Sequence, residues 1–220
     1  MKKKAIILGA TGLVGRNLVK LLLDDDRYEG VTVFVRRSTG SLHPKLTEHS
    51  VDFDNPGPWE ALVTGEDLFS CLGTTIKKAG SKDAQYTIDY TYQYRTAKAA
   101  AENGVTTYVL VSSSGANPHS RIFYSRIKGE LDRHVKGLPF QTVCILKPSV
   151  LMGEREEKRT GESLGVFLGK ILIPLIPPLK KYRPIPAETV AKAMIKAAND
   201  PDRQAISEYE LEEIFVLADK

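Results

Sequence analysis

The stretch Gly9-Ala10-Thr11-Gly12-Leu13-Val14-Gly15 decides the fold of this chain. A short apolar run over 4–8 precedes it and predicts a β-strand, and apolar residues at helical spacing predict a helix over 13–23. Glycines spaced in this way between a strand and a helix are typical of a dinucleotide-binding turn, because they allow a tight turn, a close approach of the backbone to a pyrophosphate, and close helix packing. The free N–H groups at the start of a helix also attract phosphate. We therefore predict a dinucleotide site at Gly9, Thr11, Gly12, Leu13, Val14 and Gly15, the alternative being an ordinary strand–turn–helix.

Strand and helix patterns alternate along the rest of the chain. Strands are predicted over 31–35, 48–53, 67–72, 106–112 and 140–146, and helices over 56–63, 83–103, 121–135, 164–172 and 187–198. A strand and a short helix are expected in the tail, 205–217. This alternation predicts the α/β class, a doubly wound parallel sheet of the NAD(P)-binding Rossmann type. We expect one domain over 1–220, in which 152–186 and 205–220 form a small substrate-side lobe.

Composition and charge narrow the classes of partner. The net charge of +4 is spread over 31 Lys and Arg residues, and no clustered basic face or motif indicates nucleic acid. The longest apolar run, 164–179, is interrupted by Lys170 and three prolines, so no membrane span is expected. Cys71 and Cys144 lie in apolar strands and the four histidines lack metal-ligand spacing, so we expect neither a disulfide nor a metal. No secretory apolar segment follows Met1, and a cytoplasmic protein is expected.

The end of the second predicted strand indicates which dinucleotide is bound. A site for NAD usually has an acidic residue there, which accepts the ribose hydroxyls. This chain has Arg36 and Arg37 instead. Guanidinium groups bind a 2′-phosphate that an acid would repel, so we predict NADP(H) over NAD(H). Two solvated surface arginines are the alternative.

A tyrosine and a lysine four residues apart suggest the chemistry. Tyr124 and Lys128 lie on one face of a predicted helix. A neighbouring ammonium favours the phenolate and lowers the pKa of a tyrosine, which suits proton transfer to or from an oxygen while hydride moves at a nicotinamide. The run Ser112-Ser113-Ser114, which ends the preceding strand, places a serine at the carboxyl edge of the sheet, where it can bond the reacting oxygen.

Several segments together resemble a known family. They are Gly9–Gly15, Cys71-Leu72-Gly73-Thr74-Thr75 with Lys78-Ala79-Gly80, Val111–Ala116, the Tyr-x-x-x-Lys-Gly-Glu run 124–130, Lys147-Pro148, and Gly161-Glu162. The chain resembles the short-chain dehydrogenase/reductase superfamily in its extended or atypical branch (NAD-dependent epimerase/dehydratase-like). It is most similar to the group that contains the Tat-interacting oxidoreductase and its bacterial relatives. The resemblance covers residues 5 to about 195.

The resemblance implies a role for each matching residue. Tyr124 is implied as the acid/base, Lys128 as the group that holds the nicotinamide ribose, and Ser113 as the residue that orients the substrate, with Ser114 as its rival. Further cofactor contacts are implied at Leu72, Gly73, Thr74 and Thr75 near the pyrophosphate, at Pro148 and Val150 near the nicotinamide, and at Asp52 near the adenine. Two positions depart from the superfamily: Asp89 stands where an asparagine is usual, and Lys147 where an arginine is usual.

These observations favour an NADP(H)-dependent oxidoreductase for a small carbonyl or alcohol substrate. A sugar-nucleotide epimerase or dehydratase is an alternative, but the residues after Leu146 leave little room for so large a substrate. A non-catalytic NADP(H)-sensing regulatory protein is another, although such proteins commonly lose the tyrosine and the lysine. Four tyrosines over 86–94 fit either half-buried helix surface or a dimer face, so a monomer and a homodimer both remain open.

Overall fold

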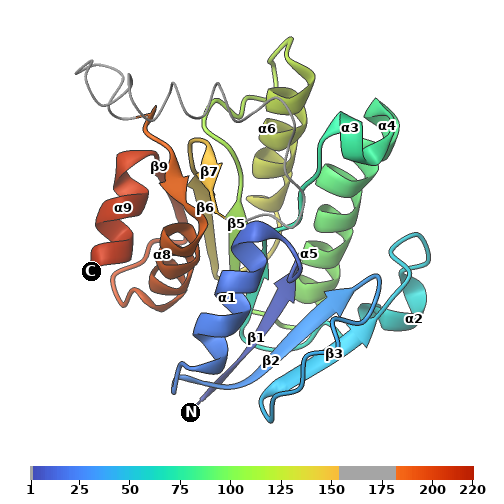
Figure 1. Cartoon of the computed structure of the whole chain (residues 1–220), viewed down its shortest axis with the longest axis vertical. Coiled ribbons are helices and arrows are strands. Elements are labelled where there is room, and N and C mark those ends of the chain that lie inside the picture. Colours follow the sequence, from blue (N-terminus) through green and yellow to red (C-terminus); the bar gives the residue numbers. More distant parts are fainter. Residues whose placement is uncertain (1, 154–181) are drawn as a thin grey trace.

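The computed structural model describes residues 2–153 and 182–220 and contains one seven-stranded sheet at its centre. All neighbouring strands in this sheet are parallel, in the order β3-β2-β1-β4-β5-β6-β9 (Figure 1). The strands are β1 (Lys3–Leu8), β2 (Tyr28–Val35), β3 (Leu46–Ser50), β4 (Asp67–Ser70), β5 (Thr107–Val111), β6 (Thr142–Lys147) and β9 (Ile206–Glu210). This is the predicted doubly wound Rossmann fold, so the predicted fold class is confirmed.

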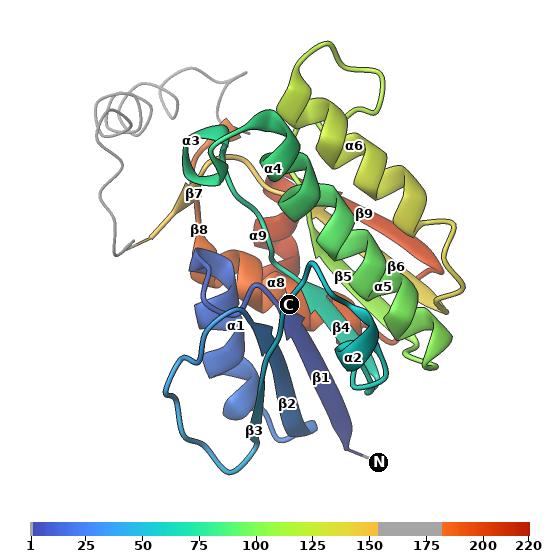
Figure 2. The same ribbon diagram turned by 90° about the vertical axis from the view of Figure 1, so that its right-hand side faces the viewer.

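Helices cover both faces of the sheet, and the alternation of side chains along each strand explains why (Figures 1 and 2). In β1, Ala5 and Ile7 face one layer while Ile6 and Leu8 face the other, and all four are buried. The first layer contains α1 (Leu13–Leu23), α8 (Ala187–Asn199) and α9 (Glu212–Asp219). The second contains α2 (Gly57–Glu60), α5 (Gln93–Glu102) and α6 (Phe123–Val135).

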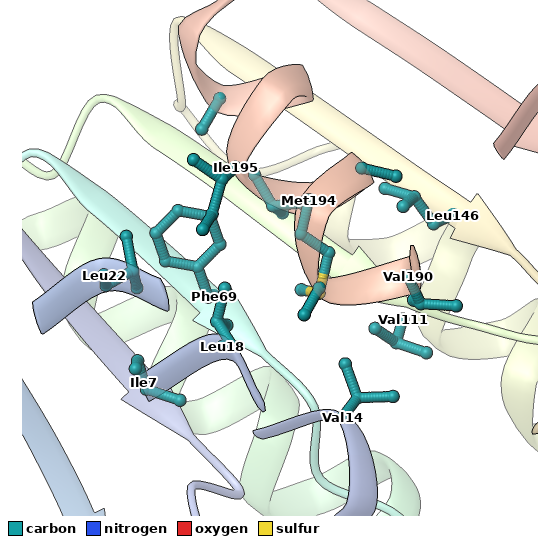
Figure 3. Packing of buried hydrophobic residues seen from close by; sticks show 14 of the residues in the cluster. Ile7, Val14, Leu18, Leu22, Phe69, Val111, Leu146, Val190, Met194 and Ile195 are labelled. Carbon is teal, nitrogen blue, oxygen red and sulfur yellow. The ribbon is translucent and has the colours of Figure 1, made fainter. Parts of the chain in front are cut away.

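Of the two buried hydrophobic clusters among residues 2–153 and 182–220, the one in the first layer is the larger. Figure 3 shows Leu18 and Leu22 of α1 beside Phe69 of β4, with Met194 and Ile195 of α8 above the same strand. These side chains join α1 to α8 across the middle of the sheet. Because strand order reverses between β1 and β4, a crevice opens at the carboxyl ends of these two strands. The turn 9–15 lies at that crevice, between β1 and α1.

The structure differs from the sequence-based prediction in the second layer. The predicted helix 83–103 consists of α4 (Lys82–Tyr86), the π-helix η1 (Thr87–Tyr92) and α5, and a short helix α3 (Ile76–Ala79) precedes it. Asp89 lies within η1 and is fully buried. The third strand ends at Ser50, so Asp52 lies in the turn after the strand rather than at its end.

The C-terminal region also differs from expectation. β9 pairs with β6, so residues 206–210 form the seventh strand of the main sheet rather than part of a separate lobe. The sequence pattern does not reveal that 206–210 would pair with β6, because that pairing joins segments far apart in the chain. Two short strands, β7 (Leu151–Met152) and β8 (Ile185–Pro186), pair beside the main sheet. The helix predicted over 164–172 and most of the lobe 152–186 lie outside the described residues. Within 2–153 and 182–220, no helix is long and apolar enough to cross a membrane.

Candidate dinucleotide and active site

The glycine turn has the geometry that its sequence predicts. A Cβ on Gly9 would lie 2.7 Å from the carbonyl carbon of Cys71, and the residue has a φ of 86° that favours glycine. A Cβ on Gly15 would lie 2.1 Å from the carbonyl oxygen of Gly9. Both glycines are therefore required for β1, α1 and the end of β4 to approach one another. Among the described residues, no side chain caps the start of α1 at Gly12, which leaves its first N–H groups available to a ligand.

A cavity of about 380 Å³ opens at this turn. It joins the glycine turn to the carboxyl end of β4 and to the first turns of α6. Of the residues predicted for the site, it is lined by Thr11, Gly12, Leu13, Val14, Leu72, Gly73, Thr74, Tyr124 and Lys128. Its other lining residues, four of which stand in quoted segments, had no individual role assigned from the sequence: Arg16, Cys71, Lys78, Val111, Ser112 and Leu151. The charged side chains among all these are cations, so the cavity suits an anionic ligand.

A second cavity of about 440 Å³ lies at the end of β2. Thr11, Val35, Arg36 and Arg37 line it, so Thr11 belongs to both cavities. The structure therefore places the two predicted arginines next to the glycine turn. Asp52 lines neither cavity: its carboxylate accepts a hydrogen bond from the backbone N–H of Asp54 at 3.0 Å, and its carbonyl accepts one from the indole of Trp59.

Tyr124 and Lys128 lie on α6 and face the same cavity. Tyr124 is 41% exposed in the first turn, whereas Lys128 is only 3% exposed one turn later. A Cβ on Gly73 would lie 3.8 Å from the Nζ of Lys128 and 3.7 Å from the Oδ1 of Asp89, so an ammonium and a carboxylate flank this glycine. The buried ammonium is thus brought from α6 to the loop after β4, which carries the other predicted contacts.

Asp89 holds that loop in place. Its Oδ1 accepts a hydrogen bond from the backbone N–H of Thr74 at 2.7 Å, and its Oδ2 accepts one from Gln85 at 3.1 Å. Burial raises the pKa of Asp89, although Lys128 and these two hydrogen bonds lower it. The residue that departs from the superfamily pattern therefore fixes the shape of the loop 72–75. Thr75 does not line the cavity; its side chain caps α3 through the N–H of Lys78.

The three serines after β5 have different surroundings. Ser112 lines the cavity and is 5% exposed. Ser113 and Ser114 are half-buried and do not line it, and the hydroxyl of Ser113 donates to the carbonyl of Ser114 at 3.3 Å. The N–H of Ser114 donates to the carbonyl of Pro148 at 3.0 Å, which ties this loop to the end of β6. Neither Pro148 nor Val150 lines the cavity, and Val150 is 55% exposed.

Gly129 was quoted in the sequence pattern without a role of its own, and the structure supplies one. A Cβ there would lie 2.3 Å from the carbonyl carbon of Asn117 and from the nitrogen of Pro118. The N–H of Asn117 also donates to the carbonyl of Ser125 at 2.9 Å. The loop 112–122 therefore packs directly on α6 beside Lys128. Glycine in the middle of a helix lowers helix stability, so its presence at position 129 was the available signal in the sequence that another segment approaches closely there.

The cysteines and histidines add no further site in the part of the chain that the structure describes. Both cysteines are free thiols, and burial raises the pKa of Cys71 to about 12 and that of Cys144 to about 11. Among residues 2–153 and 182–220, no cluster of three or more His, Cys, Asp or Glu side chains is placed to hold a metal.

Similar proteins were found by sequence. A family model described as NAD(P)H-binding matches residues 9–201. "Protein FMP52, mitochondrial" of Eremothecium gossypii is 33% identical over 218 residues, which cover 97% of this chain and 96% of the relative. The Saccharomyces cerevisiae protein of the same name is 38% identical over 171 residues, 74% of each chain.

The names of these relatives contradict the cytoplasmic location expected from the sequence, because both are called mitochondrial. The prediction was wrong for a physical reason. Few cysteines and the lack of a secretory apolar run argue only against an oxidising, secreted environment. They do not distinguish one reducing compartment from another.

Solved structures share the fold at low sequence identity. MoeE5 in complex with UDP-glucose and NAD superposes with a TM-score of 0.69 at 14% identity, covering 98% of this chain and 80% of MoeE5. The Bordetella bronchiseptica enzyme WbmH in complex with NAD+ superposes with a TM-score of 0.71 at 15% identity, covering 96% and 75%. The chain therefore belongs to the NAD(P)H-binding family and has the Rossmann fold of the extended short-chain dehydrogenase/reductases and nucleotide-sugar epimerases.

Proposed function

We propose that this protein is an NADP(H)-dependent oxidoreductase for a small carbonyl or alcohol substrate. One observation carries the proposal: Tyr124 and Lys128 line the same cavity as the glycine turn. One cavity therefore contains both an acid/base pair and the start of a helix that can bind phosphate. A binding protein that only senses the cofactor would not need this pair.

The residues present fit a dinucleotide. The close contacts of Gly9 and Gly15 shape the turn, and the uncapped start of α1 offers N–H groups to a pyrophosphate. Arg16 and Lys78 line the same cavity and add positive charge. Thr74, held by Asp89, provides a fixed backbone beside the turn.

The chemistry divides between the cofactor and the chain. Bound nicotinamide supplies or accepts the hydride. Tyr124 donates its phenolic proton to the carbonyl oxygen during reduction, or takes the alcohol proton during oxidation. The Lys128 ammonium stabilises the phenolate that results and holds the nicotinamide ribose. We assign the hydrogen bond that orients the substrate oxygen to Ser112, which lines the cavity, rather than to Ser113 or Ser114, which do not.

The preference for NADP(H) is supported by Arg36 and Arg37, which line the cavity beside Thr11. Each guanidinium can donate hydrogen bonds to a 2′-phosphate, and a bond to a charged group contributes about 1.5–3 kcal/mol. NADPH is therefore expected to bind at least about tenfold more tightly than NADH.

The test is a fluorescence titration of NADPH and NADH on wild type and on Arg36→Ala/Arg37→Ala. The double variant should bind NADPH no more tightly than NADH, and its affinity for NADH should equal that of the wild type. Arg27→Ala is the matched control, because Arg27 bonds Asp25 just before β2, at the opposite end of that strand. Equal affinity of the wild type for NADPH and NADH would refute the cofactor preference.

A carbonyl and alcohol panel tests the reaction, with Tyr124→Phe as the control. Turnover that the phenylalanine variant lacks supports the proposal. If the protein instead holds its cofactor tightly, shows no turnover on the panel and converts a nucleotide sugar, the oxidoreductase proposal would be replaced by an epimerase function.

A further inference from the structure

A buried carboxylate lies behind the Tyr124–Lys128 pair. Asp132 follows Lys128 by one helical turn, so the three side chains share a face of α6. Asp132 is 4% exposed, and neither of its carboxylate oxygens has a hydrogen-bond partner among the described residues. The hydroxyl of Ser112, which lines the cavity and is also buried, lies near this carboxylate without reaching full hydrogen-bond geometry.

Several charged and titratable groups face Asp132 from the elements around it. Lys128 lies on the same helix, Lys147 on β6, Glu208 on β9 and Tyr108 on β5. The Nζ of Lys147 is already paired with Glu208 and lies 3.3 Å from Glu210. The hydroxyl of Tyr108 also lacks a partner in the described part of the chain. Lys128 is therefore the cation near Asp132 that faces the cavity. Lys128 also meets a second buried carboxylate, that of Asp89, beside Gly73.

Burial dominates the titration of Asp132. It raises the pKa of this carboxyl to about 6, although Ser112, Lys147 and Lys128 each lower it. An unpaired buried carboxylate destabilises a fold, and an apolar residue of similar size would pack there without that cost. Ionisable groups kept in such surroundings cluster at functional sites, and this one adjoins a residue of the cavity wall.

We infer that Asp132 is a positioning residue of this site, a buried carboxylate whose charge offsets that of Lys128 and thereby sets how readily Tyr124 gives up its proton. With Asp132 ionised, the ammonium stabilises the Tyr124 phenolate less than it would alone. The purpose of this balance rests on the proposed function, in which Tyr124 is the acid/base. The electrostatic coupling itself does not depend on any ligand.

The coupling has an expected size. Eight residues of helix separate Tyr124 from Asp132, which is about 12 Å at about 1.5 Å per residue. One charge at that distance, in a partly screened site, shifts a titration midpoint by roughly half a unit to one unit. Replacing Asp132 by asparagine is therefore expected to move the Tyr124 titration to lower pH by that amount.

The experiment follows the Tyr124 ring by NMR on protein labelled with ζ-¹³C-tyrosine, without nucleotide, over a pH titration. Tyr124→Phe assigns the signal. Asp132→Asn should titrate at lower pH than wild type, and Asp132→Glu, which keeps the charge, should titrate as wild type does. An unchanged midpoint in Asp132→Asn, or an equal shift in Asp132→Glu, overturns the inference.

A second measurement remains decisive if Asp132→Asn does not fold. The Asp132 carboxyl carbon is titrated by NMR in wild type and in Lys128→Met. Loss of the ammonium should raise the pKa of Asp132 if the two charges are coupled, and an unchanged value overturns the inference. Because neither measurement uses a nucleotide, a failure to bind NADPH would refute the proposed function and leave these results standing.

Discussion

The buried carboxyl of Asp132 makes the stability of this protein depend on pH in a defined direction. Its pKa is about 6 in the folded chain, against an ordinary value of about 3.9 for an unfolded one. The folded state therefore binds the proton more tightly, and stability falls as the pH rises from about 4 to above 6. Two pH units correspond to about 3 kcal/mol, an upper figure because internal water would reduce it.

Asp132→Asn removes this titration. Relative to wild type, the variant should gain up to about 2 kcal/mol of unfolding free energy between pH 4.5 and pH 7.5, because part of the full change is already complete at pH 4.5. Urea unfolding followed by circular dichroism at both pH values measures the change. Glu130→Gln is the matched control, because it removes a more exposed carboxylate of the same helix. If the difference between wild type and Asp132→Asn is the same at both pH values, the burial argument is refuted.

Three further predictions concern other parts of the molecule. Gly129→Ala should push the loop 112–122 away from α6 and so lower both the melting temperature and the affinity for NADPH. Gly57→Ala should change neither, because no atom in the described part of the chain lies within 4 Å of its Cβ, and equal effects in the two variants would contradict the packing argument. Tyr28→Phe removes the hydroxyl that donates to Asp67 at 2.6 Å, so urea unfolding should show a loss of about 1–3 kcal/mol while NADPH affinity stays unchanged. Asp89→Leu frees the N–H of Thr74, and isothermal titration should show NADPH binding about tenfold more weakly; unchanged affinity would show that the loop 72–75 needs no such support.

Features that depend on neighbours along the chain were predictable from the sequence. The glycine turn needs only a strand, three glycines at fixed spacing and a helix, and the structure shows the close contacts that this spacing implies. Tyr124 and Lys128 share a helix face because four residues make about one turn. Alternating apolar strands and amphipathic helices likewise favoured the doubly wound sheet before any contact was known.

Which serine after β5 faces the cavity could not be predicted from neighbouring residues alone. Successive residues at the end of a strand point to opposite sides, so a shift of one residue changes which hydroxyl faces the cavity. The resemblance pointed to Ser113, with Ser114 as its rival, whereas Ser112 lines the cavity in the structure. The sequence contains all three hydroxyls but not the register at which β5 ends.

Only the tertiary structure determined which residues hold the loops and helix around the site in place. Asp89 lies in a π-helix and accepts a hydrogen bond from the N–H of Thr74, Gly129 meets the loop at Asn117, and Asp132 is buried near Lys147 of β6 and Glu208 of β9. Each of these depends on segments far apart in the sequence that pack against one another. The chain alone thus determined the turn, the helix face and the fold class, since these follow from backbone geometry over a few residues. The burial and pairing of each polar side chain were left to the packing of distant elements, because those contacts set the local dielectric and the available partners.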